Sequence, residues 1–193
     1  MAGNFFQTKA AARQVVEAVR RSLSSQQVSE WGGEVQRHLA ASGFFKGTIA
    51  LYDAQSFEVP VRVEGGAYPR LTRGSRVLSF HRCADGDFVK GPLGLREPAA
   101  HLPAIDLKDI DVWLVPGVAF TRGGERLGRG GGYYDATLAL ARPDALKIGV
   151  AFECCVVDGF PTDAHDVRMD WLVTERGVWR ADGSASPPRA SPE

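Results

Sequence analysis

The sequence predicts an α/β fold, a single layered domain in which helices flank a mostly parallel central sheet. Several short segments are almost continuously apolar, as strands buried on both faces are, and helical spacing of apolar residues precedes and separates them. The chain has 193 residues, 44% of them hydrophobic, which is enough for one domain with a sizeable core. We expect this domain to cover residues 1–180.

The charge balance and the cysteine count restrict the function. The 23 basic residues match the 23 acidic residues in number, which argues against a general nucleic-acid or membrane-surface binder. The sequence has no apolar run of about 18 residues and no signal-peptide pattern. Its three cysteines lack CxxC spacing. We therefore expect a cytoplasmic protein, a monomer or weak homodimer, whose partners are small molecules, with no nucleic acid and no membrane among them.

Two helices are predicted near the N-terminus. Apolar residues recur at helical spacing over residues 9–23, and Thr8 is a suitable N-cap. Ser24 followed by Gln27 has the spacing of a capping box, so a second helix begins there. Gly43 is expected to end it.

Five apolar runs predict strands, and helical or loop segments separate them: GTIALY, SRVLSF, DVWLVPGVAF, LKIGVAF and DWLVTE. The last residues, ADGSASPPRASPE, are small, polar and rich in proline. Such a segment buries too little apolar surface to fold, so residues 181–193 are predicted to form a disordered tail.

A glycine-rich loop follows the longest of these strands. Its sequence, RLGRGGGYYD, leads into a segment with helical spacing, which predicts a strand, a loop and a helix in succession. Glycines let the backbone approach an anion, and the start of a helix adds partial positive charge. Arg126 and Arg129 would add permanent charge. The spacing matches neither the P-loop nor the G-x-G-x-x-G motif, and a passive glycine turn remains the alternative.

Asp135 follows the two tyrosines of this segment. An acidic side chain near a helix N-terminus stabilises the helix dipole, which is one explanation for it. The other is a metal site, because Mg²⁺ beside phosphates prefers carboxylate oxygen.

The segment VPGVAFTRGGERLGRGGGYYD resembles the signature of the 5-formyltetrahydrofolate cyclo-ligase family. Further matches occur in the family's order: KAAAR near the N-terminus, GPLGLREP in the middle, and IGVAFECCVVDGFPTDAHDVRMDWLVTE after the loop. The resemblance spans roughly residues 9–176. It implies that ATP and Mg²⁺ support cyclisation of 5-formyltetrahydrofolate to 5,10-methenyltetrahydrofolate. ATP would phosphorylate the formyl oxygen, N10 would attack the activated carbon, and ADP and phosphate would be released.

The resemblance also implies roles for individual residues. ATP would be bound by Lys9, Arg13, Arg126, Leu127, Gly128, Arg129, Gly130, Gly131, Gly132, Tyr133 and Tyr134. The reduced folate would be bound by Asp53, Glu58, Arg129, Gly130, Gly131, Gly132 and Tyr133. Catalysis would fall to Arg126, Arg129 and Tyr133, and Mg²⁺ would be held by Asp135 and Asp166.

Several of these residues have a simpler interpretation. Lys9 and Arg13 lie one helical turn apart, where they would otherwise form a solvated basic face. Glu58 would otherwise be a surface acid at a strand edge, Tyr133 a core residue, and Asp166 an ordinary loop acid.

Two further polar residues are expected to have no chemical role. His165 is interpreted as a surface or capping residue rather than the general base that removes the N10 proton. Glu97, which precedes Pro98, is interpreted as structural.

Two other functions remain open at this stage. One is a non-catalytic folate or nucleotide binding protein, supported by departures from the family pattern between residues 53 and 82, among them Pro60. The other is a sugar-phosphate isomerase or CoA-transferase-like enzyme, which a similar α/β layering would permit without ATP.

Overall fold

The computed structural model describes residues 5–55, 57–92 and 94–182 of the chain. Its main feature is an eight-stranded sheet with the strand order β12-β11-β10-β7-β1-β2-β3-β6. The five central strands from β11 to β2 run parallel to their neighbours, whereas β12, β3 and β6 are antiparallel additions at the two edges. This confirms the predicted α/β class.

The strands of the main sheet are β1 (Ile49–Ala50), β2 (Ala67–Arg70), β3 (Ser79–Arg82), β6 (Ala104–Ile105), β7 (Val112–Pro116), β10 (Leu146–Val150), β11 (Trp171–Thr174) and β12 (Gly177–Arg180). Two hairpins stand apart from it: β4 (Phe88–Lys90) with β5 (Arg96–Pro98), and β8 (Ala119–Phe120) with β9 (Arg126–Leu127). The helices are α1 (Lys9–Arg21), α2 (Ser25–Ala41) and α3 (Tyr133–Leu138), with short 3-10 turns η1 (Asp85–Asp87), η2 (Leu107–Asp109) and η3 (Glu153–Cys155).

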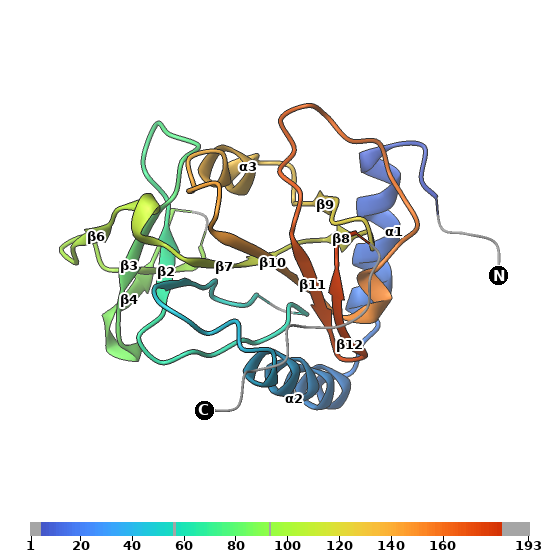
Figure 1. The fold of residues 1–193 in the computed structure, drawn as a ribbon, viewed down its shortest axis with the longest axis horizontal. Helices are drawn as coiled ribbons and strands as arrows, with labels where there is room; N and C mark the ends of the chain where they lie inside the picture. Colours follow the sequence, from blue (N-terminus) through green and yellow to red (C-terminus); the bar gives the residue numbers. More distant parts are fainter. Residues whose placement is uncertain (1–4, 56, 93, 183–193) are drawn as a thin grey trace.

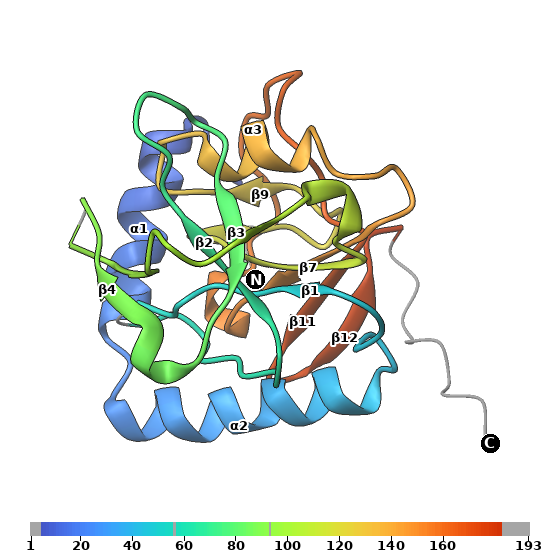
Figure 2. The ribbon, with the colours of Figure 1, turned by 90° about the vertical axis from the view of Figure 1, so that its left-hand side faces the viewer.

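Helices cover both faces of the sheet. In Figures 1 and 2, α2 runs along one side, and α3 lies on the opposite side. Helix α1 packs beside β8 and η3. The layering is the one expected for strands that are apolar on both faces.

The first two helices begin where the sequence predicts; α2 ends before Gly43 as expected, and α1 ends at Arg21, two residues before the predicted Leu23. The Thr8 side chain accepts a hydrogen bond from the Ala11 amide. Ser24 and Gln27 form a reciprocal capping box at the start of α2. Gly43 follows the C-cap residue Ser42 and has a φ of 73°, a conformation that suits glycine.

The centre of the core lies where β7 meets β10. Strand β7 is buried along four of its five residues, and its register pairs Leu114 with Ile148. The ring of Trp113 contacts that of Phe80 edge-on, with 5.1 Å between centroids. Uninterrupted apolar strands are therefore buried on both faces, as the sequence predicts.

The run DVWLVPGVAF is divided at Pro116 and Gly117, as a Pro-Gly break predicts: β7 ends at Pro116 and β8 begins at Ala119. Helix α3 ends at Leu138, before Ala141. Ala181, the first residue of the predicted tail, donates a hydrogen bond from its amide to the Asp170 carbonyl at 2.9 Å. Residues 183–193 of that predicted tail lie outside the described residues.

Candidate active site

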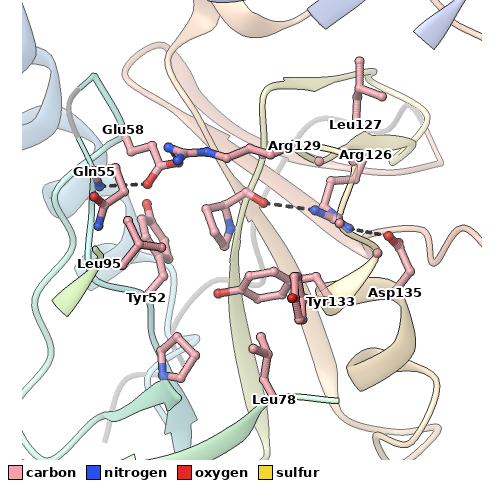
Figure 3. Close-up of a pocket in the computed structure, with 18 of the residues that line it drawn as sticks. Tyr52, Gln55, Glu58, Leu78, Leu95, Arg126, Leu127, Arg129, Tyr133 and Asp135 are labelled. Atoms are coloured by element: carbon pink, nitrogen blue, oxygen red, sulfur yellow. Dashed lines mark hydrogen bonds and ion pairs between the residues drawn. The ribbon is translucent and has the colours of Figure 1, made fainter. Parts of the chain in front are cut away.

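A pocket of about 590 Å³ opens beyond the carboxyl ends of β1 and β7. Ligands of open α/β sheets bind at this edge of the strands, and the volume is in the range for a small-molecule site. The pocket is lined by Lys9, Arg13, Tyr52, Asp53, Gln55, Glu58, Pro69, Leu71, Leu78, Leu95, Arg96, Glu97, Pro116, Gly117, all residues from Arg126 to Asp135, Asp163, His165 and Asp166. Figure 3 shows Tyr52, Leu95 and Glu58 on one side and Arg126 and Asp135 on the other.

The glycine loop between β9 and α3 forms one wall of this pocket. Gly130 and Gly132 have φ values of 102° and 70°, which favour glycine, and Gly132 is the N-cap of α3. Arg13 on α1 donates from Nε to the Gly128 carbonyl at 2.8 Å. The conformation of the loop is thus set by its own glycines and by a guanidinium from the N-terminal helix.

An ion cluster lies beside the loop. Lys9 Nζ contacts Asp163 Oδ2 and Asp166 Oδ2, both at 2.6 Å. Burial disfavours the Lys9 ammonium, but its hydrogen bonds to the two carboxylates outweigh this and raise its pKa. Burial likewise opposes the charged Asp166, yet hydrogen bonds from Lys9 and from the Asp163 amide lower its pKa. Lys9 and Asp166 are therefore both charged at neutral pH.

A second ion pair lies deeper. The Arg126 side chain is only 3% exposed; its Nη2 contacts Asp135 Oδ2 at 2.9 Å, and its Nη1 donates to the Pro116 carbonyl at 3.3 Å. The other carboxylate oxygen of Asp135 accepts a long hydrogen bond, 3.4 Å, from the Val167 amide. The residue after Asp166 is thus hydrogen-bonded to Asp135.

Asp163, His165 and Asp166 could together hold a metal ion, since one ligand atom from each lies within 4.8 Å of the others. The sequence singled out Asp166 but missed Asp163, although PTDAHD places the two only three positions apart. His165 is well exposed, as its interpretation as a surface residue predicts.

The opposite side of the pocket has more apolar surface and fewer charges. Glu58 Oε1 pairs with Arg129 of the glycine loop at 2.7 Å, and its Oε2 accepts from the Gln55 amide at 2.9 Å. In Figure 3, Arg129 reaches across the pocket toward Glu58. Burial raises the pKa of Asp53, although the nearby Arg96 guanidinium, 3.6 Å away, opposes that shift.

Glu97 lies in the same wall. Its side chain is 4% exposed, and the nearest cation, Arg70, is 3.8 Å away. A Cβ on Gly91 would come within 2.3 Å of the Glu97 carboxyl carbon, so a glycine at that position makes room for it. Burial supports the structural interpretation, but the residue also borders the pocket.

The structure brings every predicted site residue to this single pocket, from Lys9 and Arg13 on α1 to Asp166 near the C-terminus. Lining the pocket is the property that these residues share. The residues that sequence reasoning missed are mostly apolar ones from β2, β5 and the adjoining loops: Pro69, Leu71, Leu78 and Leu95. No chemical motif marks such residues in a sequence.

Together, the fold and the pocket define an α/β protein with a glycine-rich loop at the carboxyl edge of its sheet. The model of the 5-formyltetrahydrofolate cyclo-ligase family matches residues 64–175. The 5-formyltetrahydrofolate cyclo-ligase of Mycolicibacterium smegmatis is 36% identical over 165 residues, which cover 84% of this chain and 83% of that protein.

Solved structures agree with this match. The 5,10-methenyltetrahydrofolate synthetase of Aquifex aeolicus has a TM-score of 0.77 and 29% identity, covering 92% of this chain and 95% of that one. The enzyme of the same name from Mycoplasma pneumoniae has a TM-score of 0.71 and 25% identity, covering 86% and 98%. The chain belongs to the 5-formyltetrahydrofolate cyclo-ligase family.

The protein has the activity of this family: it is a 5-formyltetrahydrofolate cyclo-ligase, which is an ATP-dependent ligase. This confirms the enzyme prediction over the non-catalytic binding protein and the isomerase alternatives. None of the helices in the described part of the chain has the length and apolar content needed to cross a membrane.

Proposed function

We propose that the pocket binds ATP and 5-formyltetrahydrofolate side by side, with the glycine loop between them. The observation that carries this is the pair of contacts the loop makes. Gly128 is bound by Arg13 on the charged side, and Arg129 is bound to Glu58 on the apolar side. A ligand on either side would therefore contact the same short segment.

The triphosphate would lie over residues 128–132, near Arg13 and Lys9. The loop offers backbone N–H groups at the start of α3, and the two side chains supply full positive charges. Lys9 already contacts two carboxylates. Its ammonium has three N–H donors, so one of them would bind a phosphate oxygen while the other two keep their contacts with the carboxylates.

The folate would occupy the side formed by Tyr52, Leu71, Leu78 and Leu95. Its flat ring system suits apolar walls, and its N–H donors suit the carboxylates of Glu58 and Asp53. Tyr133, which also lines the pocket, would contact the formyl region.

In the reaction, the formyl oxygen attacks the γ-phosphorus of ATP and ADP departs. N10 then attacks the activated carbon, loses its proton, and phosphate leaves with the former formyl oxygen. The protein's part is to align these atoms and to neutralise charge as the phosphoryl group moves. Arg129 and the loop amides are placed for this role. Arg126 is buried against Asp135, so it acts as a positioning residue that fixes the carboxylate.

Mg²⁺ would be held by Asp135 and Asp166. Both offer carboxylate oxygen, the donor this ion prefers, and the Val167 amide connects the segments that carry them. A bound Mg²⁺ neutralises phosphate charge. In this chain, Arg126 orients the Asp135 carboxylate and Lys9 orients the Asp166 carboxylate for it.

Two measurements test the proposal. A crystal structure with a non-hydrolysable ATP analogue, Mg²⁺ and 5-formyltetrahydrofolate should show residues 128–132 against the phosphates and Glu58 near the folate ring. Phosphates bound away from that loop would overturn it. For the metal, Asp135→Asn should raise the Mg²⁺ concentration needed for half-maximal activity about 10-fold, whereas Asp109→Asn at an exposed site should not. An unchanged Mg²⁺ requirement would remove Asp135 from the metal site.

A further inference from the structure

Two adjacent thiols lie behind the substrate pocket and have no part in the chemistry described above. Cys154 and Cys155 belong to the turn η3, and their Sγ atoms are 4.0 Å apart. Cys155 is 2% exposed, whereas Cys154 is partly exposed and so can be reached from solvent. The third cysteine, Cys83, follows β3 on a different part of the sheet.

The surroundings favour ionisation of the outer thiol. The hydrogen bond with Cys155 lowers the pKa of the Cys154 thiol, and the Arg20 guanidinium acts in the same direction. The same hydrogen bond, together with burial, raises the pKa of Cys155. Arg20 is 6% exposed; its Nη1 donates to the Gly117 carbonyl at 3.2 Å, and its Nε has no hydrogen-bond partner among the described residues. A nucleophilic sulfur therefore sits directly beside a second one.

We propose that Cys154 and Cys155 form a two-thiol site for a trivalent arsenical that carries one organic substituent. With phenylarsine oxide as the probe, two As–S bonds form. The oxide oxygen leaves as water with the two thiol protons, and arsenic stays trivalent, so no oxidant or reductant takes part. Cys154 attacks first because it is reachable, and Cys155 then closes the ring.

The site offers only two sulfur ligands among the described residues, and this number suits an organic arsenical better than a bare metal ion. The organic group supplies the third bond of arsenic, so two sulfurs complete its coordination. Zn²⁺ in proteins takes three or four side-chain ligands. Over the described ranges of the chain, no third His, Cys, Asp or Glu ligand atom lies close enough to group with the two sulfurs.

The site also borders the substrate pocket. A small cavity behind the folate side is lined by Cys155 together with Arg20, Phe57, Glu58, Val59 and Gly117. Phe57 has a φ of 66°, an uncommon value for a bulky residue, so the backbone next to Glu58 is held by its surroundings. Closure of the dithiol ring draws Cys155 toward Cys154 and disturbs that wall. The prediction that this slows the reaction rests on the proposed position of the folate.

The first experiment measures binding without activity. The folded protein is treated with phenylarsine oxide in excess monothiol, which removes arsenic from single cysteines but not from a chelating pair, and its intact mass is recorded. Wild type and Cys83→Ser should each carry one adduct, which a dithiol such as 2,3-dimercaptopropanol removes. Cys154→Ser should carry none. Cys155→Ala, which removes the buried thiol and is checked for folding by circular dichroism, should likewise carry no adduct.

An adduct that is lost in Cys83→Ser, or that survives in Cys154→Ser, would overturn the site, and so would the absence of any adduct on wild type. The second experiment measures the cyclo-ligase rate. The arsenical should lower it about 10-fold in wild type and in Cys83→Ser, and leave Cys154→Ser unchanged. Adduct formation with full activity would overturn the link to the pocket while leaving the dithiol site in place.

Discussion

The two sides of the pocket are built differently. On the side of α1, each contact involves a charged side chain: Lys9 pairs with two aspartates, and Arg13 donates to a loop carbonyl. On the side of β2 and β5, the wall contains the pocket's leucines Leu71, Leu78 and Leu95 together with a few charged groups, and Glu58 is the carboxylate that meets the glycine loop. The charged side suits a triphosphate, and the apolar side suits a flat heterocycle.

This contrast implies that the two substrates depend on different forces. Charge-assisted hydrogen bonds are directional and are lost when one partner is removed. Contact with apolar walls is spread over many side chains, so a single substitution there has a smaller effect. Substitutions on the two sides should therefore separate the KM for ATP from the KM for folate.

The largest effect is expected at Arg13. Arg13→Ala removes a cation from the nucleotide side and also the 2.8 Å hydrogen bond that holds Gly128. At about 2 kcal/mol for a hydrogen bond with a charged partner, kcat/KM for ATP should fall about 30-fold. Steady-state kinetics would measure this. Arg21→Ala on the same helix is the control, because that side chain is 71% exposed. Equal kinetics for the two variants would contradict the placement of the triphosphate.

A smaller effect is expected at Glu58, and it should fall on the KM for folate rather than on the kinetics with ATP. Glu58→Gln keeps the shape of the side chain but loses its charge, and with it the ion pair to Arg129. The KM for 5-formyltetrahydrofolate should rise about 10-fold, while the KM for ATP changes less than about twofold. The exposed Glu64→Gln is the matched control. If the KM for ATP rose instead, the two sides would have been assigned the wrong way round.

The smallest effect concerns stability. The lowered pKa of Asp166 means that its pairing with Lys9 contributes stability above the ordinary carboxyl pKa, near 4, and that this is lost as pH falls through the lower folded value. Lys9→Met should reduce the free energy of unfolding by about 1 kcal/mol at about pH 7 and by less at about pH 3. Urea unfolding at both values measures this, with exposed Lys108→Met as reference. A constant difference across that range would argue against the pair.

The same contrast explains what the sequence could predict. The glycine loop is one contiguous segment, and the helix caps and buried strands follow from local patterns, so these features were predictable. The apolar residues Leu71, Leu78 and Leu95 come from separate loops and have no motif. The early end of α3 depends on tertiary packing, which periodicity alone does not show, whereas the break between β7 and β8 follows from the Pro116-Gly117 pair.

The attachment of α1 has a consequence for biosynthesis. Lys9 is synthesised well before its partner Asp166, which lies 157 positions later, and the carbonyl that binds Arg13 lies 115 positions after that arginine. Contacts of such long sequence separation form late. In a growing chain the polar side chains of α1 therefore lack these partners until residue 166 has been synthesised, so the charged side of the pocket is completed only after that point.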